Sequence, residues 1–208
     1  MMVPLASLSA FAALALGMVL TPGPNMIYLL TRSLCQGRAA GVVSLLGVAT
    51  GFVVYMLAAS FGVSALLLAV PHAYRAVQLA GAAYLLYLAW GALKPGGRNV
   101  LAVRQDVQAE TPLRLFITGL LTNLLNPKIA VLYVSLLPQF IDPARGSVLQ
   151  QSLLLGTVQI LISVSVNLSL VLSAGPLSRG LSGRPVWLVC QRWLMGIALI
   201  VLSVRMVV

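Results

Sequence analysis

One lysine lies near the middle of a long apolar run, and its charge is the first feature of the chain with a clear capacity for chemistry. Lys128 follows Asn126 and Pro127 inside residues 113–140, which are otherwise mainly apolar. If this run crosses a bilayer, a buried ammonium group is costly, and such residues are usually functional. We interpret Lys128 as a binding group. The structural alternative is that backbone carbonyls freed at Pro127 hold the lysine and that it has no other role.

A second break interrupts the first apolar run. Pro22, Gly23 and Pro24 fall within residues 1–31, which carry no charge. Each proline removes a backbone donor and clashes with the carbonyl four residues earlier, and the glycine adds backbone freedom. Within a membrane such breaks are tolerated only where the freed backbone lines a cavity or is covered by protein. Pro24 and Pro127 are separated by almost half of the 208-residue chain, so the two breaks occupy matching places.

Together the two breaks carry groups that suit a zwitterion. An ammonium group beside exposed backbone amides favours a carboxylate, because helix N-termini also favour negative charge. Backbone carbonyls freed at the first break, together with asparagine side chains, can accept hydrogen bonds from an amino group. We therefore predict a site for an amino acid. The predicted binding residues are Pro22, Gly23, Pro24, Asn25, Asn123, Asn126, Pro127, Lys128 and Tyr84.

The composition places the chain in the membrane class. It is 60% hydrophobic and 8% charged, whereas a soluble domain carries about 25% charged residues. Residues 39–71 and 146–178 hold no charge, and a bilayer span needs about 20 such residues. The net charge of +10 comes from basic residues scattered between apolar runs, which is typical of membrane orientation and not of nucleic-acid binding. We predict an all-α integral membrane protein in contact with the lipid bilayer.

The apolar runs divide into six predicted transmembrane helices, three in each half of the chain. A hydrophilic linker, residues 94–112, separates a first repeat, residues 1–93, from a second, residues 113–208. Because each repeat has an odd number of spans, the two must enter the membrane in opposite senses. A broken first helix in each half then predicts two inverted repeats, with the substrate site at their interface. The predicted spans are residues 5–30, 41–68, 76–93, 113–140, 148–173 and 186–207.

Small and polar residues indicate which helix faces pack together. Gly47 and Gly51 form a small-xxx-small pattern that lets helices approach closely. On the fifth predicted span small and polar residues recur every three or four positions, so they share a face that should look into the bundle. These faces fit packing within one protomer or between two, which leaves a homo-oligomer open. The residues of that second face are Ser152, Gly156, Gln159, Ser163 and Asn167.

The remaining polar positions bear on energetics and orientation. Asp106 and Glu110 lie in the linker and Asp142 lies at a span end, so no carboxylate is placed deep in the membrane. For proton-coupled transport the candidate groups are therefore Lys128, Asp142 or the substrate itself.

Most basic residues fall in the first, third and fifth loops, which predicts that those loops are cytoplasmic and that both termini lie outside. Tyr84 fits either a substrate path or an interface position.

Several other functions were weighed against transport of an amino acid. Cys35 and Cys190 form no C-x-x-C pair, and neither abuts a break proline, which argues against a membrane redox protein that passes electrons through a thiol pair. Scarce Asp, Glu, His and Cys in the spans argue against an inorganic-cation exporter. A membrane protein without transport would leave two matched breaks unexplained. An exporter of another small metabolite stays open. We predict no enzyme, no catalytic residues, no metal and no cofactor.

Several stretches in the chain resemble a known family. They are Thr-Pro-Gly-Pro-Asn at residues 21–25 and Gly-Leu-Leu-Thr-Asn-Leu-Leu-Asn-Pro-Lys at residues 119–128. Residues 47–51, 81–88 and 137–140 support them. In this order and at these spacings the chain resembles the LysE/RhtB family of amino-acid exporters.

The resemblance implies a substrate and a location. It implies an efflux protein of the bacterial cytoplasmic membrane that exports amino acids or close derivatives and is driven by the proton motive force. Basic, branched and hydroxylated amino acids occur as substrates in the family. Some relatives carry an acid near the position of Thr50, and this chain has none there. The departure favours a neutral amino acid over a cationic one.

Overall fold

The computed structural model describes residues 3–21, 23–69 and 109–181, together with isolated positions within 79–93 and 193–204. The described residues form helices and short connections, with no strand among them. This agrees with the predicted all-α class. The predicted third and sixth spans and most of the predicted linker lie outside the described residues. The arrangement of six helices as two inverted repeats, with its division at residues 94–112, therefore stays a prediction.

The first apolar run is two helices joined at a bend. Helix α1 spans Leu5–Leu20 and helix α2 spans Pro24–Gln36, and the two axes differ by 53°. The bend follows from the sequence, because Pro22 has no N–H to give to the carbonyl of Met18, and Pro24 takes the first position of α2, where a missing N–H costs nothing.

The fourth apolar run is bent in the same way. Helix α5 spans Pro112–Leu124 and helix α6 spans Pro127–Val131. The chain continues through a π-helical stretch, η1 (Leu132–Leu136), and a 3₁₀ turn, η2 (Leu137–Phe140). The axes of the two halves again differ by 53°. Both predicted breaks are therefore present in the structure.

Two long helices frame the bent pairs. Helix α3 spans Arg38–Ala69 and helix α7 spans Val148–Leu181, and a 3₁₀ turn, η3 (Pro143–Arg145), precedes α7. Both long helices contain segments that are apolar and long enough to cross a bilayer. The described residues thus supply two candidate spans, or up to four if each bent pair is one span.

The structure corrects two predicted connections. The predicted polar link at residues 31–40 is helical up to Gln36, and Gly37 alone makes the turn into α3 with a φ of 89°, a left-handed conformation that favours glycine. The predicted loop from residue 175 is still helical, because α7 continues to Leu181.

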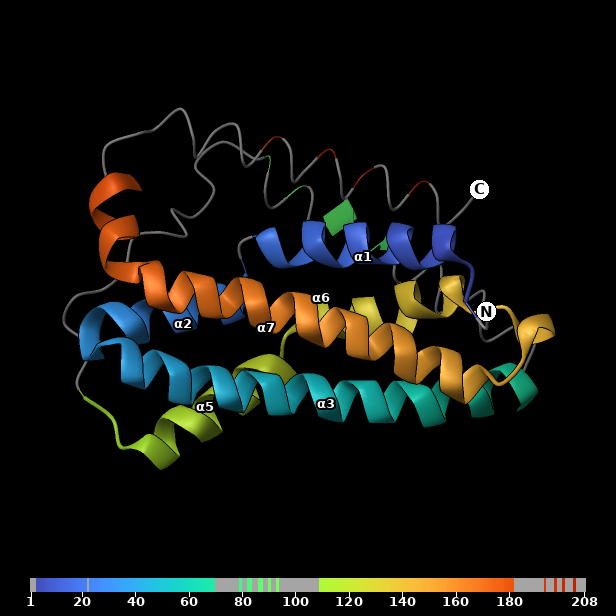
Figure 1. The fold of residues 1–208 in the computed structure, drawn as a ribbon, viewed down its shortest axis with the longest axis horizontal. Helices are drawn as coiled ribbons and strands as arrows, with labels where there is room; N and C mark the ends of the chain where they lie inside the picture. The colour runs from blue at the N-terminus through green and yellow to red at the C-terminus, as the bar shows by residue number, and fades with distance from the viewer. Residues whose placement is uncertain are drawn as a thin grey trace.

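The helices pack side by side along the longest dimension of the molecule. In Figure 1, α1, α7, α3 and α5 follow one another from top to bottom, and the corresponding neighbours are in contact. Phe11, Phe52, Tyr133 and Leu155 are fully buried in the core between them. The rings of Tyr55 and Tyr133 stack with their centroids 5.7 Å apart.

Helices α3 and α5 cross at very short range. A Cβ atom at Gly47 would collide with the backbone carbonyl oxygen of Phe116, and a Cβ at Gly119 would collide with that of Ser44. Gly51 lies against Asn123 of α5 in the same crossing, and Gly156 of α7 lies against Met56 of α3. The glycines predicted at packing faces are thus at positions where a side chain has no room.

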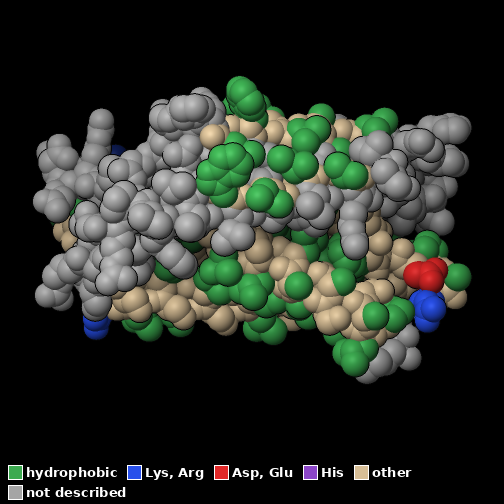
Figure 2. All heavy atoms as spheres, turned by 90° about the horizontal axis from the view of Figure 1, so that it is seen from above, with side chains coloured by type: hydrophobic (Ala, Val, Ile, Leu, Met, Phe, Trp, Pro, Cys, Tyr) green, Lys and Arg blue, Asp and Glu red, His purple; other side chains and the backbone are tan. Residues whose placement is uncertain are grey.

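The surface has the pattern of a bilayer-spanning bundle. In Figure 2 hydrophobic side chains cover the middle of the visible face, and the described charged side chains that can be seen lie toward the two ends. Leu46, Phe61 and Leu161 are among the large apolar side chains that are more than half exposed. In water this exposure would be unfavourable, whereas lipid tails solvate it.

An ion-pair cluster at one end ties α2 to the start of α5. Arg32 Nη2 lies 2.8 Å from Glu110 Oε1, and both side chains are largely buried. The side chain of Gln36 also donates to the Glu110 carbonyl and accepts from its backbone N–H. Arg114 approaches the same carboxylate oxygen at 3.4 Å. The cluster joins residues that are 74 positions apart in the chain.

Replacing Glu110 with glutamine should weaken the fold measurably. The substitution keeps the shape and the backbone contacts but leaves Arg32 without its anion, so we expect the free energy of unfolding to fall by about 2 kcal/mol. Thermal unfolding of purified protein in detergent measures the effect. The matched control is Asp142→Asn, at the exposed pair with Arg145, where we expect a loss of less than about 1 kcal/mol. Equal shifts for both variants would contradict the role of the cluster.

Candidate functional site

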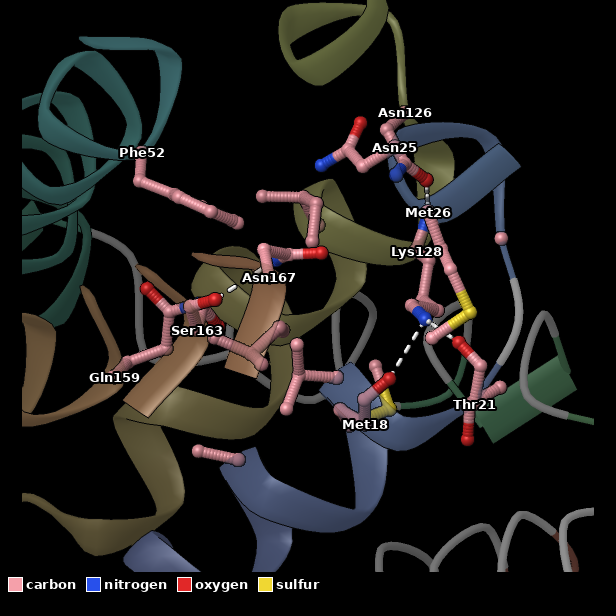
Figure 3. Close-up of a pocket in the computed structure, with 15 residues that line it drawn as sticks. Met18, Thr21, Asn25, Met26, Phe52, Asn126, Lys128, Gln159, Ser163 and Asn167 are labelled. Carbon is pink, nitrogen blue, oxygen red and sulfur yellow. Dashed lines mark hydrogen bonds between the residues drawn. The ribbon is translucent and has the colours of Figure 1, made fainter. Parts of the chain in front are cut away.

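The side chain of Lys128 connects the two helix breaks. Its ammonium nitrogen donates to the carbonyl oxygen of Met18 at 2.6 Å and to that of Thr21 at 2.7 Å (Figure 3). Only 7% of the residue is exposed. The residue four positions after Met18 is Pro22, which has no N–H to donate to the Met18 carbonyl. The ammonium group of Lys128 donates that hydrogen bond instead. The lysine is therefore held by carbonyls at the first break, and not by carbonyls freed at Pro127 as the structural alternative supposed.

The charge of Lys128 suits the place where it lies. The C-terminal end of a helix carries partial negative charge, so a cation is stabilised at the end of α1. Gly23 leaves space for it, since a Cβ there would lie 3.3 Å from the ammonium nitrogen. The backbone of Lys128 is fixed as well, because its N–H donates to Asn126 Oδ1 at 3.1 Å. Asn126 thus caps α6 and sets the second break.

The positive charge of Lys128 has no carboxylate beside it in the described part of the chain. Glu110 pairs with arginines near the end of α2, and Asp142 pairs with Arg145 outside α6. An ammonium group has three donors, and two of them reach carbonyls. One donor of the ammonium group is therefore available to an anion.

A small cavity lies beside this ammonium group. Residues from α1, α2, α3, α6, η1 and α7 line it, so both bent pairs and both long helices contribute. Its volume is about 20 Å³, which holds about one water molecule. Met18, Met26, Phe52, Ile129 and Leu132 supply apolar surface. An amino acid can enter only when the surrounding helices move apart.

The structure brings together several of the predicted binding residues. Gly23, Asn25, Asn126 and Lys128 all line the cavity. Asn25 is buried, and its side-chain oxygen has no hydrogen-bond partner in the described part of the chain. These four residues come from both breaks, so the cavity lies between the two predicted breaks.

Other predicted residues lie elsewhere. Asn123 does not line the cavity: it is fully buried against Gly51, and neither of its side-chain polar atoms has a hydrogen-bond partner among the described residues. Pro24 and Pro127 open α2 and α6 and act through the backbone. Asp142 caps η3 and binds Arg145 at the surface, away from the cavity.

Three predicted or weighed residues cannot be placed. Pro22 and Tyr84 lie outside the described residues. The thiol-pair alternative needs Cys190, which also lies outside them.

The prediction of the site omitted one wall of the cavity. Gln159, Ser163 and Asn167 of α7 line it and are buried. The sequence signal for them was present, since their spacing of four residues had placed them on one inward face. What the sequence lacked was any sign that this face would lie opposite Lys128.

One family of known proteins matches this chain over most of its length, including both breaks and the buried lysine. The family model of the LysE type translocator matches residues 16–208. The chain belongs to the LysE family. This LysE-family protein is therefore a membrane transporter, and the apolar helices that bend at the two breaks are part of a multi-pass membrane fold.

Individual relatives of this LysE-family protein come from several bacteria. An uncharacterised membrane protein of Bacillus subtilis is 32% identical over 76% of this chain and 78% of its own length. An uncharacterised membrane protein of Pseudomonas aeruginosa is 35% identical over 67% of this chain and 68% of its own. A leucine efflux protein of Klebsiella pneumoniae is 34% identical over 62% of this chain and 60% of its own. No solved structure matches the chain.

Proposed function

We propose that this protein exports a neutral amino acid with an apolar side chain from the cytoplasm. One observation carries the proposal: a buried ammonium group without a carboxylate partner in the described residues borders a cavity whose other walls are apolar or carry uncharged amides and hydroxyls. Such a site offers one charge, and that charge attracts an anion. The carboxylate of an amino acid is an anion of suitable size.

Lys128 is the group that binds the carboxylate in this proposal. Its ammonium is already anchored at the end of α1 by Met18 and Thr21, so its third donor and its charge are held in place before the substrate arrives. A charge-assisted hydrogen bond of this kind is about twice as strong as a neutral one. Asn126 accepts a hydrogen bond from the backbone N–H of Lys128 and so holds the backbone of the lysine in place.

The apolar walls set the preference for the substrate side chain. Met18, Met26, Phe52, Ile129 and Leu132 offer no charge to a cationic or anionic side chain. A basic side chain would add a second cation beside Lys128, with no described carboxylate there to balance it. The efflux protein of Klebsiella pneumoniae, a relative of this chain, is named for leucine, and branched or sulfur-containing apolar amino acids are the substrates that we propose here.

The small volume of the cavity, about 20 Å³, implies a transport cycle with at least two further states. We propose that the bent pairs α1–α2 and α5–α6 open the cavity alternately to the two sides of the bacterial cytoplasmic membrane. In the proposed topology six spans form two inverted repeats and both termini lie outside. The proton motive force drives export, and the candidates for proton coupling are Lys128, Asp142 at the rim, and the substrate itself.

Counterflow in reconstituted vesicles tests the proposed substrate class. Vesicles are loaded with a mixture of common amino acids, and uptake of each labelled amino acid is measured in turn. We expect leucine, isoleucine, valine and methionine to exchange, and lysine, arginine and glutamate to exchange much more slowly. Vesicles without protein are the blank. Exchange of only the charged amino acids would refute the proposed specificity, and exchange of none by folded protein would refute amino-acid transport.

A further inference from the structure

Three polar side chains of α7 form a buried row on the wall of the cavity. Gln159, Ser163 and Asn167 are 1%, 3% and 2% exposed, although the helix that carries them is mostly apolar. Burial of polar groups is unfavourable unless they find partners, and in a membrane lipid provides none. The row therefore requires an explanation beyond packing.

Hydrogen bonds within the row fix the direction of Asn167. Tyr133 donates its hydroxyl hydrogen to Gln159 Oε1, and Gln159 Nε2 donates to Ser163 Oγ at 2.8 Å. Asn167 Nδ2 donates to the backbone carbonyl of Ser163, also at 2.8 Å. Because the amide nitrogen of Asn167 is turned toward its own helix, the amide oxygen is turned the opposite way. Figure 3 shows that oxygen pointing into the space between α7 and Lys128.

A second asparagine, Asn25, lines the same cavity at the first break. Asn25 is 6% exposed, and its Oδ1 accepts no hydrogen bond from the residues that the structure describes. Leaving a buried acceptor without a partner is costly, on the order of 1–3 kcal/mol. Asn167 Oδ1 also accepts no hydrogen bond from the described residues. The amide oxygen of Asn167 thus lies across the cavity from the ammonium donor of Lys128.

We infer that Asn167 binds the amino group of the substrate, while Lys128 binds its carboxylate. Amide oxygens accept hydrogen bonds and carry no charge, so they bind an ammonium group without neutralising Lys128 or attracting a free metal cation strongly. Gln159 and Ser163 act as positioning residues because they hold Asn167 in its orientation. This inference rests on the proposed function and extends it from the carboxylate to the second end of the zwitterion.

The test compares two substrates that differ only in the group at the α carbon. Leucine carries an ammonium group there, and 2-hydroxyisocaproate, the α-hydroxy acid with the same carbon skeleton, carries a hydroxyl. Half-saturation concentrations for counterflow of each labelled compound are measured with wild type and with Asn167→Leu, which removes the amide at similar volume. We expect the preference for leucine over the hydroxy acid to fall by about tenfold or more.

Two further variants keep the test decisive. Asn167→Ser keeps a polar group but shortens it out of reach, so it should lose the preference for leucine even if the leucine variant does not fold. Ser169→Ala, on an exposed face of the same helix where the hydroxyl bonds only to Ser165, should leave both half-saturation concentrations unchanged.

The outcomes separate this inference from the proposed function. A fall in the preference for leucine, with the hydroxy acid still exchanged, supports the amino-group site. An unchanged preference in folded variants overturns it, whether or not transport is slower, and so does equal loss of both compounds. If wild type exchanges leucine normally in those cases, the proposed function stands without this site. If wild type exchanges no amino acid, the proposed function and this inference both fail.

Discussion

Lys128→Met is expected to reduce amino-acid exchange by about 10- to 100-fold. The variant removes the only charge among the described residues that line the cavity, and a charged hydrogen bond to a carboxylate contributes about 1.5–3 kcal/mol, or roughly one to two factors of ten. It also leaves the carbonyls of Met18 and Thr21 without their donor. The measurement is counterflow of labelled leucine in vesicles that contain equal amounts of inserted protein.

Abundance and folding of the Lys128 variant serve as its internal controls. We expect the inserted amount to change little, because replacing a buried charge with an apolar side chain of similar length is often neutral for stability. Lys128→Ala should behave in the same way for transport. Arg145→Met, which removes a half-exposed cation outside the cavity, should transport normally. Normal export by Lys128→Met at normal abundance would show that the lysine has a structural role alone.

Gly47→Ala is expected to destabilise the protein by about 3 kcal/mol, the upper end of the usual cost of overpacking. The new methyl group would meet the backbone carbonyl of Phe116, and a backbone atom cannot move aside as a flexible side chain can. The two helices would have to separate along the crossing of α3 and α5. Thermal unfolding in detergent and the yield of folded protein both report the loss.

The same helix offers a matched control for that substitution. A Cβ at Gly62 has no atom within 4 Å, so Gly62→Ala should stabilise α3 by up to about 1 kcal/mol through helix propensity. Gly119→Ala, on the other side of the crossing, should resemble Gly47→Ala because its methyl group would meet the carbonyl of Ser44. If Gly47→Ala and Gly62→Ala unfold at the same temperature, the close crossing does not limit stability.

The sequence was sufficient to predict both breaks, because proline acts on the backbone within four residues of its own position. The same locality predicted Lys128 as the unusual charge and placed Asn25 and Asn126 beside it. Which carbonyls would bind the ammonium was not predictable, since that depends on how α1 lies against α6. The tilt of two helices is a property of their packing, and no short motif records it.

The features that the sequence did not predict also depend on how the helices pack. Asn123 and Asn126 are three residues apart and looked equivalent, yet the helix ends between them, so one is buried against Gly51 while the other caps α6. The row of Asn167 was recognised as inward-facing, but its partner across the bundle was unknown. Gly37 was sufficient by itself to turn the chain, whereas the polar residues before it had suggested a longer link.

The small size of the cavity has a consequence for the energetics of the cell. A transporter in a membrane that stores a proton gradient would discharge it if water could form a continuous file through an idle molecule. In the described part of this chain the polar space holds about one water molecule, and a fixed cation stands beside it. We therefore expect Lys128 to repel hydronium and sodium ions from this space, and a zwitterion, which carries no net charge, to enter it more readily.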